Sequence, residues 1–181
     1  MKNTIHNDPL DALGKIYEDM YEHVVDNLHN AEDKTEHLAH KLIEEAKEKT
    51  IKIEKQSQKE AEMLAHYLKR DLSDTAHYLS NTGHELKNWL GFETALLESE
   101  FLDLLLKVAD KTTVKLLQMK EESHSSTSFH TGEVTGPGTF VCDECGEKLY
   151  FYKAGKIPTC SKCNAETFHR VTIPPNGTNI D

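Results

Sequence analysis

The chain has 181 residues, of which 37% are hydrophobic and 29% are charged, and its formal net charge is −10. This length allows one moderate domain and a second, small one. The acidic balance argues against general nucleic-acid binding, because neutralising phosphates requires clustered cations, so such a role would need a local basic patch. No apolar run of about 18 residues predicts a membrane span. The first residues lack the apolar core of a signal peptide, and we therefore expect a cytoplasmic protein.

Residues 8–30 predict the first helix. Apolar side chains recur there at steps of three or four, so they share one face of a helix. Asp8 is expected to cap this helix, and Pro9 suits its first turn. The residues on the apolar face are Leu10, Leu13, Tyr17, Met20, Val24 and Leu28.

A second helical stretch begins near Asp33. Its apolar stripe thins toward Lys55, where Glu and Lys dominate. Ser57 and Glu60 fit a capping box, which favours a new helix at that point. One continuous helix through residues 33–80 is the alternative.

A third apolar repeat starts at Met63 and should end near Gly83, where glycine can supply a C-terminal cap. Thr82 and Glu85 fit a second capping box, which would open a last helix running to about Glu122. That helix carries the richest apolar pattern of the chain.

The length of this last helix bears on the fold class. Roughly 38 residues at about 1.5 Å each span about 57 Å, and so long a helix needs long partners. We therefore expect a mainly α protein of long antiparallel helices, as a hairpin, a bundle or a coiled coil, with a homodimer as one way to supply partners. Gly91 is a place for a kink or a close contact within it.

The composition changes after the helices. A serine-rich stretch followed by glycine and proline predicts a flexible linker at residues 123–138. Short strand-like runs then predict a small β ribbon at 139–173, and the last residues, 174–181, are expected to be disordered. The helical domain would thus occupy residues 1–122.

All four cysteines lie in the ribbon, as two CxxC pairs: Cys142 and Cys145, then Cys160 and Cys163. Two residues between ligands let one tight turn point both sulfurs at one ion, and a second such turn completes a tetrahedral zinc site. Four thiolates leave no open coordination position, so one structural Zn²⁺ is expected rather than a catalytic one. Rubredoxin-like iron is the alternative.

A ribbon of about 40 residues cannot bury enough apolar surface to fold alone, which explains the need for a metal. Gly146 and Asn164 follow the two pairs and suit the left-handed backbone of such turns. Replacing any one cysteine with serine is expected to unfold the ribbon and to leave most of the helical signal. The candidate core residues beneath the metal are Phe140, Tyr150, Phe151, Ile157 and Phe168.

Cations interleaved with aromatic side chains give the ribbon a modest basic character. Such a pattern is typical of a nucleic-acid platform, but solvated strand residues above core aromatics would look the same. The residues concerned are Lys148, Tyr150, Tyr152, Lys153, Lys156, Lys162, Phe168, His169 and Arg170.

Other chemistry-bearing patterns are weak. His37 and His40, like Asp74 and His77, have helical spacing, but a di-iron bundle needs repeated Glu-x-x-His motifs that do not occur here. No nucleophile elbow, P-loop or dinucleotide fingerprint is present, so we do not expect an enzyme.

Several segments resemble the YbeL-like family of bacterial zinc-ribbon-containing proteins. They are Lys69–Leu72, Trp89–Glu93, Val108–Thr112, Gly132–Gly138 and Cys142–Gly146. The resemblance covers most of the chain from about residue 60 onward. It implies a helical N-terminal region and a C-terminal zinc ribbon, and it supplies no activity.

The leading functional hypothesis is a non-enzymatic interaction protein that docks a macromolecular partner, most simply another protein, through its helices and ribbon. The alternative is a transcription- or RNA-associated regulator that contacts RNA polymerase or nucleic acid. Some polymerase secondary-channel factors combine a helical hairpin, acidic at its tip, with a cysteine–zinc element. The acids considered for such a tip are Asp33, Asp74 and Glu85.

Overall fold

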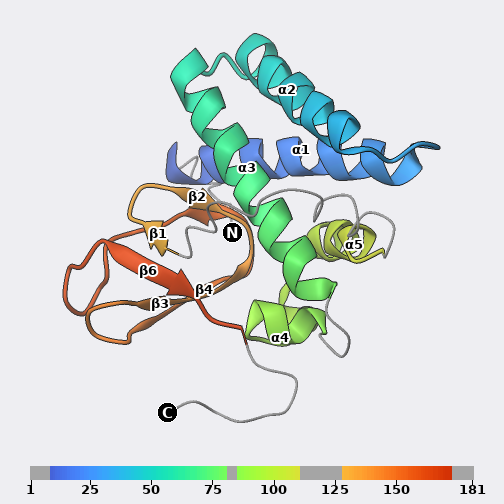
Figure 1. The fold of residues 1–181 in the computed structure, drawn as a ribbon. Coiled ribbons are helices and arrows are strands. Elements are labelled where there is room, and N and C mark those ends of the chain that lie inside the picture. Colours follow the sequence, from blue (N-terminus) through green and yellow to red (C-terminus); the bar gives the residue numbers. More distant parts are fainter. Residues whose placement is uncertain (1–8, 81–84, 111–127, 173–181) are drawn as a thin grey trace, which may run out of the picture.

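The computed structural model describes residues 9–80, 85–110 and 128–172 (Figure 1). The helices are α1 (Pro9–Asn30), α2 (Glu36–Ile53), α3 (Gln58–Leu79), α4 (Leu86–Leu90), a 3₁₀ turn (Thr94–Leu96) and α5 (Ser99–Val108). The strands are β1 (Ser128–His130), β2 (Val134–Thr135), β3 (Gly138–Cys142), β4 (Lys148–Phe151), β5 (Gly155–Lys156) and β6 (Thr167–Arg170). Antiparallel helices thus precede small antiparallel sheets, as predicted. None of the described helices is long and apolar enough to cross a membrane.

Polar caps set the boundaries of α2 and α3. The hydroxyl of Thr35 accepts a hydrogen bond from the backbone N–H of Leu38 (3.2 Å) at the start of α2. At the start of α3, the hydroxyl of Ser57 accepts from the N–H of Glu60 (3.2 Å), and the Glu60 carboxylate accepts from the N–H of Ser57 (3.0 Å). This reciprocal pair is the predicted capping box, and two helices rather than one span residues 36–79.

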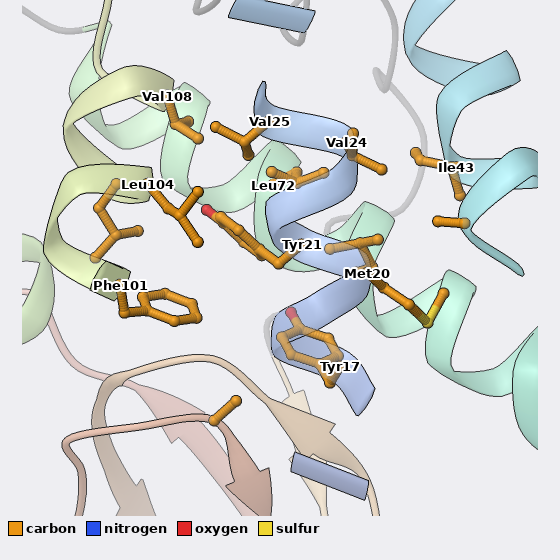
Figure 2. Close-up of a cluster of buried hydrophobic side chains, with 14 of the residues drawn as sticks. Tyr17, Met20, Tyr21, Val24, Val25, Ile43, Leu72, Phe101, Leu104 and Val108 are labelled. Atoms are coloured by element: carbon orange, nitrogen blue, oxygen red, sulfur yellow. The ribbon is translucent and has the colours of Figure 1, made fainter. Parts of the chain in front are cut away.

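The main core lies between α1 and the helices α2, α3 and α5 (Figure 2). The ring of Phe101, on α5, packs against the ring of Tyr21, with the two ring centroids 5.0 Å apart. The predicted first helix is confirmed from Pro9 to Asn30, while its expected cap, Asp8, lies outside the described residues. The side chains that α1 buries are Ile16, Tyr17, Met20, Tyr21, Val24, Val25 and Leu28.

The prediction of one long helix over residues 85–122 is wrong for the described part of that segment, which α4, the 3₁₀ turn and α5 divide. Gly91 ends α4 because its backbone is left-handed (φ 77°), and its N–H donates to the carbonyl of Lys87 (2.9 Å). The chain can therefore fold back, and α5 packs against α1 and α3. At the predicted second capping box, Glu85 makes no side-chain cap bond. Residues 81–84 and 111–127 lie outside the described residues.

The strands form two antiparallel sheets. The larger has the order β1-β6-β3-β4, and the smaller pairs β2 with β5. In the larger sheet, Phe140 of β3 lies opposite Leu149 of β4 and Arg170 of β6. Because side chains alternate between the faces of a strand, this row points inward. It lies on a second, smaller core beside the cysteines.

Residues 128–138 differ from the flexible linker predicted at 123–138. They contain β1, β2 and the first residue of β3, and β2 contacts both α1 and α3. Phe129, Val134 and Thr135 are buried. Residues 128–138 therefore form part of the interface between ribbon and helices. Residues 123–127 and the predicted tail at 174–181 lie outside the described residues.

Candidate metal centre and its attachment to the helices

Four thiol groups meet at the end of β3. The sulfurs of all four cysteines lie within 4.8 Å of one another. The Sγ of Cys142 is 3.5 Å from that of Cys163, and the Sγ of Cys145 is 3.5 Å from that of Cys160. Zinc–sulfur bonds of about 2.3 Å place tetrahedral sulfurs about 3.8 Å apart. The cluster therefore has the dimensions of a closed four-thiolate site.

Two similar turns present these sulfurs. In the first, the N–H of Gly146 donates to the carbonyl of Cys142 (3.0 Å), whose own N–H donates to the carbonyl of Glu147 (2.9 Å). In the second, the N–H of Asn164 donates to the carbonyl of Cys160 (2.9 Å), and the N–H of Cys160 donates to the carbonyl of Ala165 (2.9 Å). The two CxxC pairs are thus structurally equivalent, as expected for two halves of one tetrahedral site.

A left-handed residue closes each turn. Gly146 has a φ of 72° and Asn164 a φ of 61°, which confirms the prediction for both positions. Backbone N–H groups of Cys163 and Lys162 lower the pKa of Cys160 to about 7. These N–H groups thus favour the thiolate, which is the form that binds metal.

The small core beside the cysteines contains most of the predicted residues. Phe140, Ile157 and Phe168 are fully buried, and Phe151 packs against them. Tyr150 was expected there too, but it is 48% exposed, because strand alternation places it on the opposite face of β4 from Phe151.

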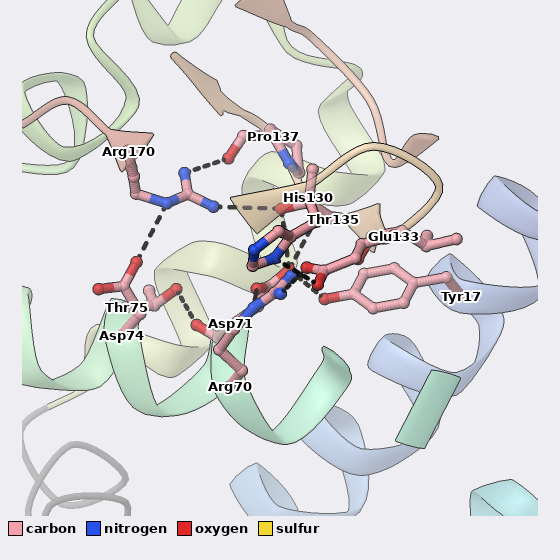
Figure 3. A network of polar contacts seen from close by, with 12 residues as sticks. Tyr17, Arg70, Asp71, Asp74, Thr75, His130, Glu133, Thr135, Pro137 and Arg170 are labelled. Carbon is pink, nitrogen blue, oxygen red and sulfur yellow. Dashed lines mark hydrogen bonds and ion pairs between the residues drawn. The ribbon is translucent and has the colours of Figure 1, made fainter. Parts of the chain in front are cut away.

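A buried carboxylate joins the ribbon to the helices (Figure 3). Asp71, on α3, is 1% exposed. Its Oδ2 accepts hydrogen bonds from the hydroxyl of Tyr17 (2.6 Å) and from the backbone N–H of Gly136 (2.9 Å). The hydroxyl of Thr135 donates to the same oxygen (3.2 Å), and Nε of Arg70 donates to Oδ1 (3.0 Å). Both oxygens are satisfied, as a buried charge requires.

A second charged side chain crosses the same boundary from the ribbon. The Arg170 side chain is 4% exposed, with its Nε 3.0 Å from a carboxylate oxygen of Asp74 on α3. Its Nη1 donates to the carbonyl of Pro137 (2.9 Å). The guanidinium carbon lies 4.3 Å from the ring centroid of Trp89 and 4.6 Å from that of Phe140. Arg170 thus connects a helical tryptophan, a helical carboxylate and the ribbon core.

Two glycines provide space at this junction. A Cβ at Gly91 would lie 2.6 Å from the hydroxyl oxygen of Thr139, which itself donates to the carbonyl of Leu90 (2.8 Å). A Cβ at Gly138 would lie 1.8 Å from Nη1 of Arg170. A side chain at Gly91 would push α4 away from β3, and one at Gly138 would displace the guanidinium of Arg170.

This junction is not among the features predicted from the sequence, although the sequence contains a signal for it. Asp71 lies three residues after Leu68 and next to Leu72, on the buried stripe of α3. A carboxylate on such a stripe needs buried partners. Three segments that carry the family resemblance, Lys69–Leu72, Trp89–Glu93 and Gly132–Gly138, supply residues to the junction.

The other candidate residues do not assemble. His37, His40 and His77 are exposed. Within the described ranges, the four cysteines are the one group of His, Cys, Asp and Glu with metal-binding proximity. The three acids considered for a hairpin tip lie in three different segments: Asp33 after α1, Asp74 within α3 and Glu85 before α4.

The basic and aromatic residues of the ribbon separate into two groups. Phe168 and Arg170 point into the molecule, where the first is core and the second joins the junction. Lys148, Tyr150 and His169 are exposed on the opposite face of the sheet.

Comparisons with known proteins agree with this geometry. The family described as zinc-ribbon containing domain matches residues 26–172. Relatives include the "Uncharacterized protein YbeL" of Escherichia coli (strain K12) and of Escherichia coli O157:H7. Each is 28% identical over 134 residues, which cover 74% of this chain and 82% of the relative. No solved structure matches the chain. The four-cysteine cluster in such a domain is the site of one structural Zn²⁺.

Proposed function

Because this chain belongs to the DUF1451 zinc-ribbon containing domain family, we propose that it is a non-enzymatic binding protein. Its ribbon is a platform, held rigidly on the helical body, that docks a macromolecular partner in the cytoplasm. The zinc ion has a structural role in this proposal, since four thiolates fill a tetrahedral coordination sphere and leave no position for substrate.

One observation carries the proposal: two tyrosines are exposed side by side on a surface that the rest of the fold immobilises. Tyr150 is 48% exposed and Tyr152 is 43% exposed, and their rings stack with centroids 6.4 Å apart. Large exposed aromatic side chains are typical of binding surfaces. The edge-on ring of Phe92, from the helical body, holds Tyr152 in place (centroids 4.9 Å apart).

The helices offer a second contact region. An open groove of about 460 Å³ runs between α1 and α2. Acidic side chains dominate its polar lining, with Asp19, Glu22, Asp26 and Glu54 against Lys49. A partner that also contacts this groove would need a complementary, basic surface.

Native purification without added metal tests the proposal. The wild-type chain should carry one zinc and retain a macromolecule, or a second copy of itself, through gel filtration. The Tyr150→Ser/Tyr152→Ser variant should keep the zinc and lose that companion. A wild-type chain that elutes as a bare monomer, or a variant that retains every companion, would contradict the proposal.

A further inference from the structure

The register of the larger sheet sorts its side chains onto two faces. Thr139 lies opposite Tyr150, and Val141 lies opposite both Lys148 and His169. These residues therefore share one face, which we call the outer face. The other face carries Phe140 and its core neighbours. On the outer face, the end of α4 covers Thr139, whereas Val141 is half-buried and Lys148, Tyr150 and His169 are exposed.

The outer face has a different charge from the rest of the molecule. The chain has 31 acidic and 21 basic residues, yet no strand position on this face is acidic. Two carboxylates from outside the face contact its histidines: Asp143 contacts His169 (Oδ1 to Nδ1, 2.6 Å), and Glu133 contacts His130 (Oε1 to Nδ1, 3.2 Å). The carboxylate of Glu147 lies 4.0 Å from the ammonium of Lys162. The face positions are Ser128, His130, Thr139, Val141, Lys148, Tyr150, Thr167 and His169.

The aromatic geometry suits flat ligands. The rings of Tyr150 and Tyr152 are nearly parallel, with an interplanar angle of 7°. Their centroids lie 6.4 Å apart. Bases can stack on exposed rings of this kind, and such stacking tolerates any base sequence.

We propose that the outer face binds single-stranded nucleic acid, with bases against Tyr150 and Tyr152 and a phosphate beside Lys148. This inference rests on the proposed function and names the partner of the same surface. The acidic body limits the footprint to a short segment, because backbone extending beyond the face meets net negative charge. Binding should therefore be weak, and each lysine–phosphate contact should contribute about −0.7 to the slope of log affinity against log salt.

Fluorescence anisotropy on the zinc-loaded full chain tests the inference, with labelled oligouridylate, oligothymidylate and a DNA duplex as probes. Both single strands should bind more tightly than the duplex, whose bases cannot reach the tyrosines. Tyr150→Ser/Tyr152→Ser should weaken single-strand binding about tenfold or more, and Lys148→Glu should weaken it and reduce the salt slope. Lys59→Glu and Met63→Ser, both exposed on α3, are the matched controls and should bind as wild type does.

The inference is overturned if wild type binds neither single strand up to about 100 µM, the weak end of non-specific affinity. It is equally overturned if the ribbon variants, with zinc content unchanged, bind as wild type does. In either case a protein that copurifies with wild type but not with Tyr150→Ser/Tyr152→Ser would preserve the proposed function. If the single-strand binding test fails and no companion protein depends on the two tyrosines, the proposed function is contradicted as well.

Discussion

Asp71 is a carboxylate at a position where the repeat of α3 calls for an apolar side chain. It is tolerated because donors from α1, from α3 and from the ribbon approach its two oxygens. Burial and the neighbouring Asp71 raise the pKa of Tyr17 well above its usual value, so the tyrosine stays protonated and donates. Such a network is satisfied only when the ribbon is docked, which makes it specific for one arrangement.

Removing the Asp71 carboxylate should destabilise the whole molecule. Asp71→Ala leaves Tyr17, Thr135 and the N–H of Gly136 without their acceptor, and breaking a buried charged network of this kind costs about 3–5 kcal/mol. Urea unfolding followed by circular dichroism measures the free energy of unfolding. Asp33→Ala, in an exposed turn, is the control and should change it by less than about 0.5 kcal/mol. Equal effects of the two substitutions would contradict the role of Asp71.

At the scale of elements, the turn after α4 sets the position of the ribbon. Gly91 and Gly146 have similar left-handed backbones, with φ of 77° and 72°. Only Gly91 has a neighbour close to its missing Cβ, the hydroxyl of Thr139 at 2.6 Å, whereas nothing lies within 4 Å at Gly146. The two positions therefore separate backbone strain from the contact between α4 and β3.

Alanine substitutions at both glycines test that contact. Each substitution should lower the free energy of unfolding by about 1–2 kcal/mol, because alanine is strained in a left-handed conformation. Gly91→Ala should lower it by about 1–3 kcal/mol more, because its methyl group would overpack against Thr139. Chemical denaturation of the zinc-loaded chains gives both values. If Gly146→Ala proved as costly as Gly91→Ala, the close approach of α4 to β3 would contribute nothing to stability.

The capping box of α3 should make stability depend on pH. Hydrogen bonds from the hydroxyl and N–H of Ser57 lower the pKa of Glu60. A carboxyl whose pKa is lower in the folded chain adds stability above its unfolded pKa, and loses that contribution as pH falls through the lowered value. Glu60→Gln should therefore lower the melting temperature at neutral pH and lower it progressively less below about pH 4. A gap between the two melting curves that stays constant with pH would be inconsistent with this role.

At the scale of the molecule, local signals in the sequence predicted well and long-range contacts did not. The CxxC spacing, Gly146, Asn164 and the Ser57 capping box are local, and the structure agrees with each. The long last helix failed because its apolar pattern continues through Gly91, where tertiary contact with β3 decides the conformation.

The described part of the predicted linker, residues 128–138, is ordered for a related reason. Residues 132–138 read as flexible because glycine and proline surround a single large apolar residue, Val134, which the structure buries. Their backbone also makes buried hydrogen bonds: the N–H of Gly136 donates to Asp71 on α3 (2.9 Å), and the carbonyl of Pro137 accepts from Arg170 on β6 (2.9 Å). Backbone contacts of this kind leave no pattern along the chain.

These contacts change the expected consequence of metal loss. The sequence alone suggests that a cysteine substitution unfolds the ribbon and spares the helices. In the structure, an unfolded ribbon would withdraw Thr135 and Gly136 from Asp71, and Arg170 from Asp74 and Trp89. Because buried polar groups would lose their partners, we expect Cys163→Ser to lower the thermal stability of the helices as well.

The most direct test of this account is thermal unfolding of the zinc-loaded chain and of the same chain after chelation. Helix content is followed by circular dichroism, and zinc release by a metal indicator. If ribbon and helices form one cooperative unit, zinc release and helix loss coincide, and chelation shifts helix melting to a clearly lower temperature. Helices that melt at the same temperature with and without zinc would show that the ribbon is an independent attachment and would contradict the account.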